Sequence, residues 1–386
     1  LQVLDTSSQI SSQNNAVKKV FDYPQRGFIF DRNGELLVSN QPSYDVMVIP
    51  KNIDSFSSEL KKEFCELLKI TEEKYDNILK RAKIYSPRLP SVVVSQFTKD
   101  EYAYLSEKMW KYKGFYIQKR SLREYQVSNS ANVFGYIAEV NKTIIDKNSY
   151  YQMGDLIGKA GVEMEYENIL RGKKGVKHLQ MDRFNREIGS YQEGVFDTIP
   201  INGKDITLTI DSRLQEYGEK LLTNKRGGIV ALEPSTGEIL ALISAPNYDP
   251  KLLVGRERSK NFTKLWYDTI SRPLFNRVLQ GEYPPGSPFK TLTALIGMQE
   301  EVVHKDEKLI CQGSYNYGGK KNLGCHLHKT PLNMSEGLAN SCNTYFCKIY
   351  KRTLEKFSTP QEGIDNWKRH LMSFGLGNYI GYDLPP

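Results

Sequence analysis

The feature that most constrains the fold is an apolar hairpin pattern followed by a long block with helical periodicity. Residues 228–233 and 238–244 are two apolar segments, and a Pro-Ser-Thr-Gly turn joins them. Further on the pattern becomes mostly helical, over residues 287–296 and again over residues 334–354. Strands followed by a run of helices are typical of an α+β domain, so we predict that fold class.

A change of pattern near residue 204 indicates that a different domain precedes this one. At 386 residues the chain is too long for one ordinary domain. Strand-like alternation begins at residue 205, after a segment rich in proline and glycine. We therefore expect an N-terminal domain over residues 1–204 and a second domain over residues 205–386.

Within the N-terminal domain, residues 26–38 predict a hairpin, because apolar segments flank an Asn-Gly turn. Helical periodicity over residues 55–82 and 98–112 predicts helices there. Residues 162–170 predict a further helix, and acidic side chains crowd its first turns, as the helix dipole favours.

The charge and hydropathy patterns exclude two classes of protein. The net charge of +8 arises from 53 basic and 45 acidic side chains spread along the chain, whereas a nucleic-acid-binding protein concentrates its basic residues on one face. The longest apolar run, residues 239–245, is far shorter than the ~18–20 residues that span a bilayer, and no signal peptide is present. We expect a soluble chain whose start at Leu1, rather than at Met, is a boundary within a longer protein.

Ser287 and Lys290 form a Ser-x-x-Lys pattern at the predicted start of a helix. Pro288 suits the first position of that helix, where its missing N–H is not needed, and the spacing places Lys290 on the face that carries Ser287. A serine nucleophile needs such a base, and the amine acts only when it is neutral. The alternative is that Ser287 merely caps the helix, and Ser58 and Lys61 show the same pattern in an expected surface helix.

A second pattern, Ser-x-Asn, follows in the same domain at Ser341 and Asn343. A hydroxyl and a carboxamide at this spacing can relay a proton and hold a substrate amide. The pattern is common, since Ser12 and Asn14 also match it. Its place after Ser-x-x-Lys gives it weight, because active-site serine enzymes that act on penicillin and on cell-wall peptides use both motifs together with a Lys-Thr-Gly strand.

Taken together and in order, these segments resemble class B penicillin-binding proteins. The Ser-x-x-Lys motif lies in Tyr-Pro-Pro-Gly-Ser-x-x-Lys, as in that family, and residues 205–215 and 228–250 are similar to the family's entry into its transpeptidase domain and the hairpin that follows. The N-terminal part carries residues similar to the family's three non-catalytic motifs, namely Arg26, Gly27, Asp31, Arg32, Asn33 and Gly34 for the first, Arg123, Tyr125, Gly135 and Tyr136 for the second, and Gly158, Gly161, Glu163, Tyr166 and Gly172 for the third. The resemblance covers nearly all of the chain.

The resemblance implies an α+β fold in which a non-catalytic pedestal or dimerisation-like domain precedes a transpeptidase domain. The first domain would carry an inserted head region at about residues 51–122. Ser287 would attack the carbonyl of the penultimate D-Ala of a peptidoglycan stem peptide, with Lys290 as its base. Ser341 would relay a proton, Asn343 would bind the substrate amide, and the Ser287 N–H would form half of an oxyanion hole. β-Lactams would mimic D-Ala-D-Ala and acylate Ser287. No cofactor would be required for this reaction.

The resemblance also implies a cellular setting. The cysteine-rich stretch before Ser341 points to the elongation-type members of the class rather than the division-type ones. Such a protein would be held at the cytoplasmic membrane by a single-pass anchor absent from this chain, with its catalytic domain on the outer, periplasmic side. Its expected partners are peptidoglycan stem peptides, β-lactams, a membrane glycan polymerase of the shape-elongation-division-sporulation family and scaffold proteins of the elongation complex, but not nucleic acid.

The chain departs from the family pattern after Ser341, because no Lys-Thr-Gly or Lys-Ser-Gly follows. The family would continue well beyond Pro386, so we expect the transpeptidase domain to lack its C-terminal part. A missing third motif would remove one oxyanion donor, and the loss of one such donor costs roughly 10²–10³ in rate. We therefore expect the chain as given to be inactive or nearly so.

The chain has five cysteines, and four of them fall late in the sequence. Cys311, Cys325 and Cys342 with His328 make a thiolate and imidazole set of the kind that binds zinc, and Cys325 and His328 have a chelating spacing. Cys347 is a poor candidate, because helical geometry turns it away from Cys342. The alternatives are a disulfide, which an oxidising envelope favours, or neither. Some elongation-type relatives carry a metal site just before Ser-x-Asn, and the resemblance therefore implies a structural zinc.

Other functions share part of this pattern. A penicillin-sensing receptor or a serine β-lactamase would carry Ser-x-x-Lys but would not need the three N-terminal motifs. A division-type transpeptidase would share all of them. A non-enzymatic scaffold that activates a glycan polymerase could lose Lys290 or Asn343, and both are present, which favours an enzyme.

Overall fold

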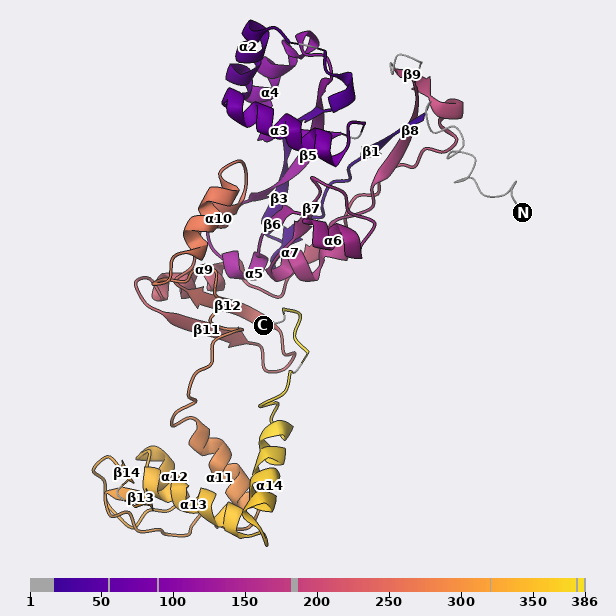
Figure 1. The fold of residues 1–386 in the computed structure, drawn as a ribbon. Coiled ribbons are helices and arrows are strands. Elements are labelled where there is room, and N and C mark those ends of the chain that lie inside the picture. Colours follow the sequence, from indigo (N-terminus) through magenta and orange to yellow (C-terminus); the bar gives the residue numbers. More distant parts are fainter. Residues whose placement is uncertain are drawn as a thin grey trace. The chain divides into compact units, whose positions relative to one another are not determined.

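The structure divides into two compact units, residues 1–281 and residues 282–385. A mixed sheet organises the first unit. The computed structural model describes residues 17–54, 56–88, 90–181, 187–319, 321–379 and 381–384 (Figure 1). Within these residues the sheet has five strands, β2 (Ile29–Phe30), β3 (Leu36–Val48), β4 (Ser91–Phe97), β5 (Phe115–Tyr125) and β10 (Ile206–Thr207). The long β3 pairs antiparallel with β2, β4 and β5, and β10 lies parallel to β2. The pairing of β2 with β3 is the hairpin predicted there.

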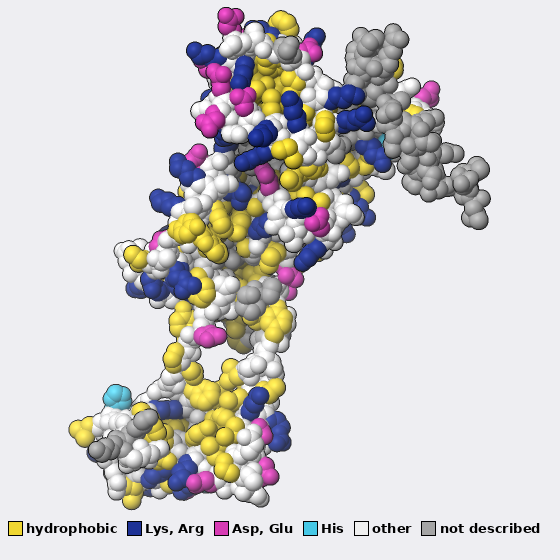
Figure 2. Space-filling view, in the orientation of Figure 1, with side chains coloured by type: hydrophobic (Ala, Val, Ile, Leu, Met, Phe, Trp, Pro, Cys, Tyr) yellow, Lys and Arg dark blue, Asp and Glu magenta, His cyan; other side chains and the backbone are white. Residues whose placement is uncertain are grey.

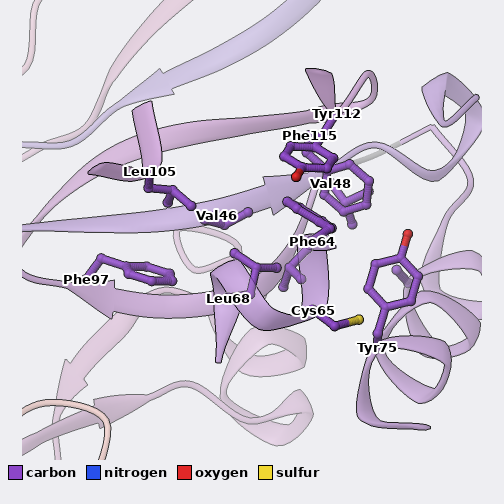
Figure 3. Close-up of a cluster of buried hydrophobic side chains, with 12 residues drawn as sticks. Val46, Val48, Phe64, Cys65, Leu68, Tyr75, Phe97, Leu105, Tyr112 and Phe115 are labelled. Atoms are coloured by element: carbon purple, nitrogen blue, oxygen red, sulfur yellow. The ribbon is translucent and has the colours of Figure 1, made fainter. Parts of the chain in front are cut away.

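A head region of helices packs against this sheet and buries an aromatic core. Its helices are α2 (Ser58–Leu68), α3 (Glu72–Tyr85) and α4 (Lys99–Ser106), and the short η1 (Pro50–Asn52) and η2 (Met109–Lys111) flank them. The ring of Phe64 lies 4.2 Å from that of Tyr112 and 4.6 Å from that of Phe115, centroid to centroid (Figure 3). The helical stretch predicted over residues 55–82 is two helices, because Lys69 adopts a left-handed conformation (φ 56°) that ends α2.

Short elements make up the rest of the N-terminal part. The strands are β1 (Val17–Asp22), β8 (Gly175–Met181) and β9 (Glu187–Ser190) in one sheet and β6 (Ile137–Glu139) and β7 (Leu156–Gly158) in another. The helices are α5 (Ala131–Phe134), α6 (Lys142–Lys147), α7 (Gly161–Glu165), α8 (Glu167–Leu170) and η3 (Tyr191–Gly194). The helix predicted over residues 162–170 is therefore interrupted, and the break falls at Tyr166, whose backbone is not helical.

A buried cluster of charged residues links these short elements to the main sheet. Glu163 of α7 is fully buried, and its carboxylate accepts hydrogen bonds from Arg123 Nε and Arg26 Nε, each at 2.6 Å. Arg123, on β5, also donates to the carbonyl oxygen of Gly27 at 2.7 Å. Burial alone would raise the pKa of Glu163, but the two guanidinium groups outweigh it and lower the pKa. The carboxylate therefore stays ionised inside the protein.

The last part of the first unit contains the predicted apolar hairpin. β11 (Gly227–Leu232) and β12 (Ile239–Ala245) pair antiparallel, and α9 (Ser212–Leu221) packs on β12. The Gln215 side chain donates to the Leu242 carbonyl at 2.9 Å and accepts from the Leu242 N–H at 2.8 Å. It thus satisfies both backbone groups of a strand residue, as a neighbouring strand would. η4 (Pro250–Leu253) and α10 (Arg258–Trp266) follow.

In the residues that the structure describes, the second unit consists of helices and a small hairpin. Its elements are α11 (Phe289–Gln299), β13 (Ser314–Gly318), β14 (Lys321–Gly324), α12 (Met334–Ala339), α13 (Asn343–Glu355) and α14 (Pro360–Ser373). Buried residues of α11 and α13, among them Ala294, Tyr345 and Ile349, form its core. Figure 2 shows hydrophobic side chains over α11 and α14, where a groove of about 680 Å³ is lined by residues such as Phe289 and Leu371. Among the described residues of the whole chain, no helix is both long enough and apolar enough to cross a membrane.

Candidate active site

Ser287 and Lys290 lie at the start of α11, as the Ser-x-x-Lys pattern predicts. Gly286 has a positive φ of 64°, so the chain turns sharply just before the helix. Pro288 precedes the first helical residue, and no side chain caps this end of the helix through a hydrogen bond. The hydroxyl of Ser287 instead lies 2.8 Å from the hydroxyl of Ser341. This contact argues against the alternative that Ser287 serves as a helix cap.

Ser341 and Asn343 lie where α12 ends and α13 begins. Ser341 has a left-handed backbone (φ 49°), which is costly for a residue with a side chain and is common at functional sites. Asn343 is the first residue of α13. The other Ser-x-Asn match, Ser12 and Asn14, lies outside the described residues.

Close packing of α11 against α13 brings the two motifs together. Gly297 of α11 faces Ile349 of α13, and a Cβ atom at Gly297 would lie only 2.4 Å from Ile349 Cγ2. The missing side chain therefore allows the helices to approach. Since Ser287 and Lys290 lie at one end of α11, and Asn343 starts α13, this approach sets the distances within the site.

The amine of Lys290 lies among four oxygen atoms. Its Nζ is 2.6 Å from Asn343 Oδ1 and 2.7 Å from the carbonyl oxygen of Ser341. It is also 2.9 Å from the hydroxyl of Ser341 and 3.2 Å from that of Ser287. The amide and carbonyl oxygens can only accept, so each takes one N–H. A neutral amine has two N–H bonds, and its lone pair then remains free to take a proton from a hydroxyl.

Burial of Lys290 shifts its equilibrium toward the neutral amine. Partial burial lowers the pKa of Lys290, although the neighbouring thiols of Cys342, Cys325 and Cys347 act in the opposite direction when they ionise. Each of the four oxygens around Nζ is formally neutral. The arrangement can therefore remove a proton from Ser287, directly or through the Ser341 hydroxyl.

Sulfur and nitrogen atoms gather beside this site in a group that we call the Cys/His cluster. Its four potential ligand atoms lie within 4.8 Å of one another and belong to Cys311, Cys325, His328 and Cys342. All five cysteines of the chain are free. Cys347 and His326, which the structure also describes, lie outside the cluster. The set of three thiols and one imidazole suits a tetrahedral zinc ion.

The imidazole of His328 is prepared for a ligand. Its Nδ1 lies 2.8 Å from the carbonyl oxygen of Lys329, and since a carbonyl only accepts, Nδ1 carries the proton. Nε2 is buried and has no hydrogen-bond partner among the described residues. A buried nitrogen lone pair beside three thiols, on a ring oriented through its other nitrogen, fits a metal ligand.

The thiols of the cluster differ in how readily they ionise. Burial raises the pKa of Cys325, but hydrogen bonds from the hydroxyl and N–H of Thr344 outweigh it and lower the pKa to about 7. Burial raises the pKa of Cys342 to about 12. Of these two thiols, Cys325 is the one that ionises first and becomes available to a cation.

Two groups near the site escaped the sequence analysis. The backbone carbonyl of Gly324 accepts from Asn343 Nδ2 at 2.7 Å, and Thr344 contacts the sulfur of Cys325 through its N–H and its hydroxyl. A carbonyl group has no signature in a sequence. Thr344 follows the Ser-x-Asn motif directly, but a threonine in the first turn of a helix gives no sign of its partner.

Models of two protein domains match the chain in succession. The penicillin-binding protein dimerisation domain matches residues 21–208, and the penicillin-binding protein transpeptidase domain matches residues 227–386. The chain belongs to the penicillin-binding protein family. The α+β fold predicted for it, a non-catalytic domain followed by a transpeptidase domain, is confirmed.

Relatives of this penicillin-binding protein carry one recurring name. The peptidoglycan D,D-transpeptidase MrdA of Acinetobacter baumannii is 32% identical and covers 94% of this chain, which spans 52% of that relative. MrdA of Escherichia coli is 30% identical, over 98% of this chain and 59% of its own length. The chain thus spans little more than half the length of these curated relatives.

Solved structures give the same result. Penicillin-binding protein 2 (PBP2) of Helicobacter pylori, in its complex with MreC, matches with a TM-score of 0.78 and 26% identity, over 96% of this chain and 68% of that one. The same protein alone matches with a TM-score of 0.73 and 25% identity. These matches confirm the prediction of a penicillin-binding protein of the PBP2 type.

Proposed function

We propose that this penicillin-binding protein is a serine-type peptidoglycan D,D-transpeptidase that cross-links stem peptides during cell-wall elongation and is acylated by β-lactams. The observation that carries the proposal is the contact of Lys290 Nζ with the hydroxyls of Ser287 and Ser341 and with Asn343 Oδ1. Relatives named peptidoglycan D,D-transpeptidase support it. Catalytic roles are assigned to Ser287, Lys290, Ser341 and Asn343.

The first half of the reaction forms an acyl-enzyme. Ser287 Oγ attacks the carbonyl carbon of the penultimate D-Ala while its proton passes to Lys290, directly or through the Ser341 hydroxyl, which lies 2.8 Å from Ser287 Oγ. The peptide bond then breaks, and the amine of the leaving terminal D-Ala takes this proton from Lys290. The Ser287 N–H stabilises the oxyanion of the tetrahedral intermediate.

The second half transfers the acyl group. An amine of a neighbouring stem peptide attacks the ester of Ser287 and gives its proton to Lys290. The ester bond breaks, the proton returns to Ser287 Oγ, and a new peptide bond joins the two strands. Asn343 holds the amide of the substrate during both steps, because its carboxamide can both donate and accept.

Turnover with a stem-pentapeptide analogue and an acceptor amine tests this function. The full-length protein, called the intact protein below, should release D-Ala and form the cross-linked product, and Ser287→Ala should reduce both by at least about 10⁴-fold, since the nucleophile is lost. Ser58→Ala removes the serine of the other Ser-x-x-Lys match and should leave the rate unchanged. A Ser287→Ala protein that still forms product would overturn the proposal.

We further propose that the Cys/His cluster binds one structural zinc ion through Cys311, Cys325, His328 and Cys342. The ion would cross-link these four residues and take no part in the acyl transfer. The support is the grouping of the four ligand atoms within 4.8 Å and the buried Nε2 of His328, which has no hydrogen-bond partner in the described part of the chain.

Metal analysis of the purified protein tests the zinc site. We expect close to one zinc per chain, and its loss in Cys325→Ser or His328→Ala with a fall in melting temperature, because structural zinc binding is coupled to folding. Cys347→Ser, outside the cluster, should retain the metal. A disulfide between Cys311 and Cys325 in a zinc-free protein would contradict the proposal.

The setting of the enzyme completes the proposal. We infer that it works at the outer, periplasmic face of the cytoplasmic membrane, held there by a single-pass anchor. Its partners would be a membrane glycan polymerase of the shape-elongation-division-sporulation family and scaffold proteins of the elongation complex. The solved complex of the Helicobacter pylori PBP2 with MreC supports the scaffold partner. The division into a domain over residues 1–204 and one over residues 205–386 stays a prediction.

A further inference from the structure

The carboxamide of Asn343 is held between the active site and the Cys/His cluster. Its Oδ1 accepts from Lys290 Nζ at 2.6 Å, and its Nδ2 donates to the Gly324 carbonyl at 2.7 Å. Gly324 is bonded directly to Cys325, and Asn343 is bonded directly to Cys342. Asn343, which carries the carboxamide, and Gly324, whose carbonyl accepts from it, are therefore each the direct sequence neighbour of a cysteine of the cluster.

The Gly324 carbonyl decides which way the carboxamide points. A carbonyl oxygen can only accept, so the NH₂ end of Asn343 must face it and the oxygen end must face Lys290. In the flipped orientation the NH₂ group would face the lysine amine and two acceptors would oppose each other at Gly324. If Gly324 moved away from α13, its carbonyl would no longer determine the orientation of the Asn343 carboxamide.

Thr344 ties the same two segments together a second time. It is 3% exposed, and its N–H donates to the sulfur of Cys325 at 3.2 Å, while its hydroxyl lies 3.1 Å from the same atom. A thiolate only accepts, so a hydroxyl at this distance from a metal-bound Cys325 donates to it. The sulfur of Cys325 thus satisfies an N–H in the first turn of α13, where helical N–H groups have no partner within the helix.

We propose that Thr344 is a positioning residue, which links occupation of the Cys/His cluster to the orientation of the Asn343 carboxamide. The inference rests on the proposed acylation of Ser287 and on the proposed metal site. A metal ion bound by Cys325 and Cys342 fixes both sulfurs. Because Thr344 is hydrogen-bonded to the Cys325 sulfur, the position of that sulfur influences the position of the start of α13. The peptide bond between Gly324 and Cys325 couples the same sulfur to the Gly324 carbonyl, which selects the orientation of the carboxamide.

Cobalt in place of zinc gives a direct readout of the Thr344 bond. In the cobalt-loaded intact protein, Thr344→Val removes the hydroxyl and keeps the shape, so the thiolate-to-cobalt charge-transfer band should move to longer wavelength. Affinity for the metal should fall by about tenfold, as for other residues that hold a metal ligand. Thr344→Ser should restore both.

A matched control lies in the same helix. Thr353 is fully buried in α13, and its hydroxyl donates to the Ile349 carbonyl at 3.0 Å, far along the helix from the cluster. Thr353→Val should leave the cobalt band and the metal affinity unchanged, even if it lowers the melting temperature. A band that moves equally in both variants, or in neither, overturns the role of Thr344.

Acylation by a fluorescent penicillin measures the link to the active site. Removal of zinc should slow acylation of the unaltered protein, and zinc-loaded Thr344→Val should be slowed as well, whereas Thr344→Ser and Thr353→Val should keep the rate. If zinc-loaded Thr344→Val acylates at the unaltered rate, the inference is wrong. If the unaltered protein is not acylated at all, the proposed function fails first, and the inference falls with it, although the cobalt band would still report the Thr344 bond.

Discussion

Ser287 and Ser58 stand at the same spacing from a lysine, yet the two lysines lie in opposite electrostatic environments. Lys290 Nζ contacts formally neutral oxygen atoms, and burial lowers its pKa. Lys61 Nζ donates to the Asp76 carboxylate at 2.9 Å, which raises its pKa. The Ser-x-x-Lys pattern alone does not tell these two lysines apart, because Asp76 lies on α3 and contacts Lys61 of α2 only when the two helices pack.

The lowered pKa of Lys290 predicts how acylation depends on pH. The neutral amine is the active form, so the rate of acylation by penicillin should rise with pH and level off with an apparent pKa below about 10.4, the ordinary value for lysine. The measurement is the acylation rate of the intact protein across neutral and alkaline pH. A rate that rises only above the ordinary lysine range would contradict the role given to Lys290.

The residues of the candidate site were predictable from the sequence, whereas the groups that orient them were not. Ser287, Lys290, Ser341 and Asn343 lie in motifs whose spacing follows from helix geometry and family resemblance, and the structure brings the four together. The Gly324 carbonyl and Thr344 act through contacts between segments that are distant in the sequence. Such contacts depend on the packing of the β13–β14 hairpin against α13.

At the scale of the elements, segments with a strong apolar pattern were predicted correctly, whereas a hairpin made of polar segments was not. The apolar strands β11 and β12 form as predicted. The β13–β14 hairpin was not predicted, because its sequence, Ser-Tyr-Asn-Tyr-Gly followed by Lys-Asn-Leu-Gly, lacks the apolar alternation that marks a half-buried strand. The described side chains of this hairpin are mostly exposed, so no core face shapes its sequence.

Glu300, at the C-terminal end of α11, ties three helices of the second unit together. Its carboxylate accepts from Lys356 Nζ at 2.9 Å, beyond the end of α13, and from Asn366 Nδ2 at 2.8 Å, on α14. His370 Nε2 lies 2.6 Å away, also on α14. The hydrogen bonds from Lys356, His370 and Asn366 lower the pKa of Glu300 to about 2.

This shift predicts a loss of stability in acid. The pKa of Glu300 is about 2 in the folded protein against an ordinary 4.5, so its stabilising effect is complete above pH 4.5 and is lost as the pH falls toward 2. The effect is at most about 3 kcal/mol. Urea unfolding of the intact protein at several pH values measures it, and Glu300→Gln should remove part of the acid dependence. An unchanged dependence in Glu300→Gln would contradict this explanation.

At the scale of the whole molecule, compact units and family domains divide the chain differently. The matches to the two domain models end at residue 208 and begin again at residue 227, whereas the compact units meet at residues 281 and 282. The apolar hairpin β11–β12 explains the difference, because Gln215 and α9 hold it within the first unit. A pattern along the sequence shows the hairpin but not the unit that it packs into.

The buried cluster of Arg26, Arg123 and Glu163 should contribute strongly to the stability of the first unit. Arg123→Ala leaves the buried Glu163 carboxylate with one of its two guanidinium partners, and it also leaves the Gly27 carbonyl without that donor. We expect a fall in the free energy of unfolding of about 3 kcal/mol. Denaturant unfolding gives the value.

A surface ion pair provides the control for this prediction. Lys220 and Glu216 pair at 2.6 Å on the exposed face of α9, and Lys220→Ala should change the unfolding free energy little, because solvent screens such pairs. Equal effects of Arg123→Ala and Lys220→Ala would show that the buried cluster has no special weight.

Mapping the penicillin adduct by peptide mass spectrometry tests the proposed enzyme most directly. In the intact protein treated with a penicillin, we predict one covalent adduct per chain, on the peptide that contains Ser287, and no adduct in Ser287→Ala. Ser58→Ala should carry the adduct at Ser287 like the unaltered protein. An adduct on any other residue, or one that persists in Ser287→Ala, would contradict the assignment of Ser287 as the nucleophile.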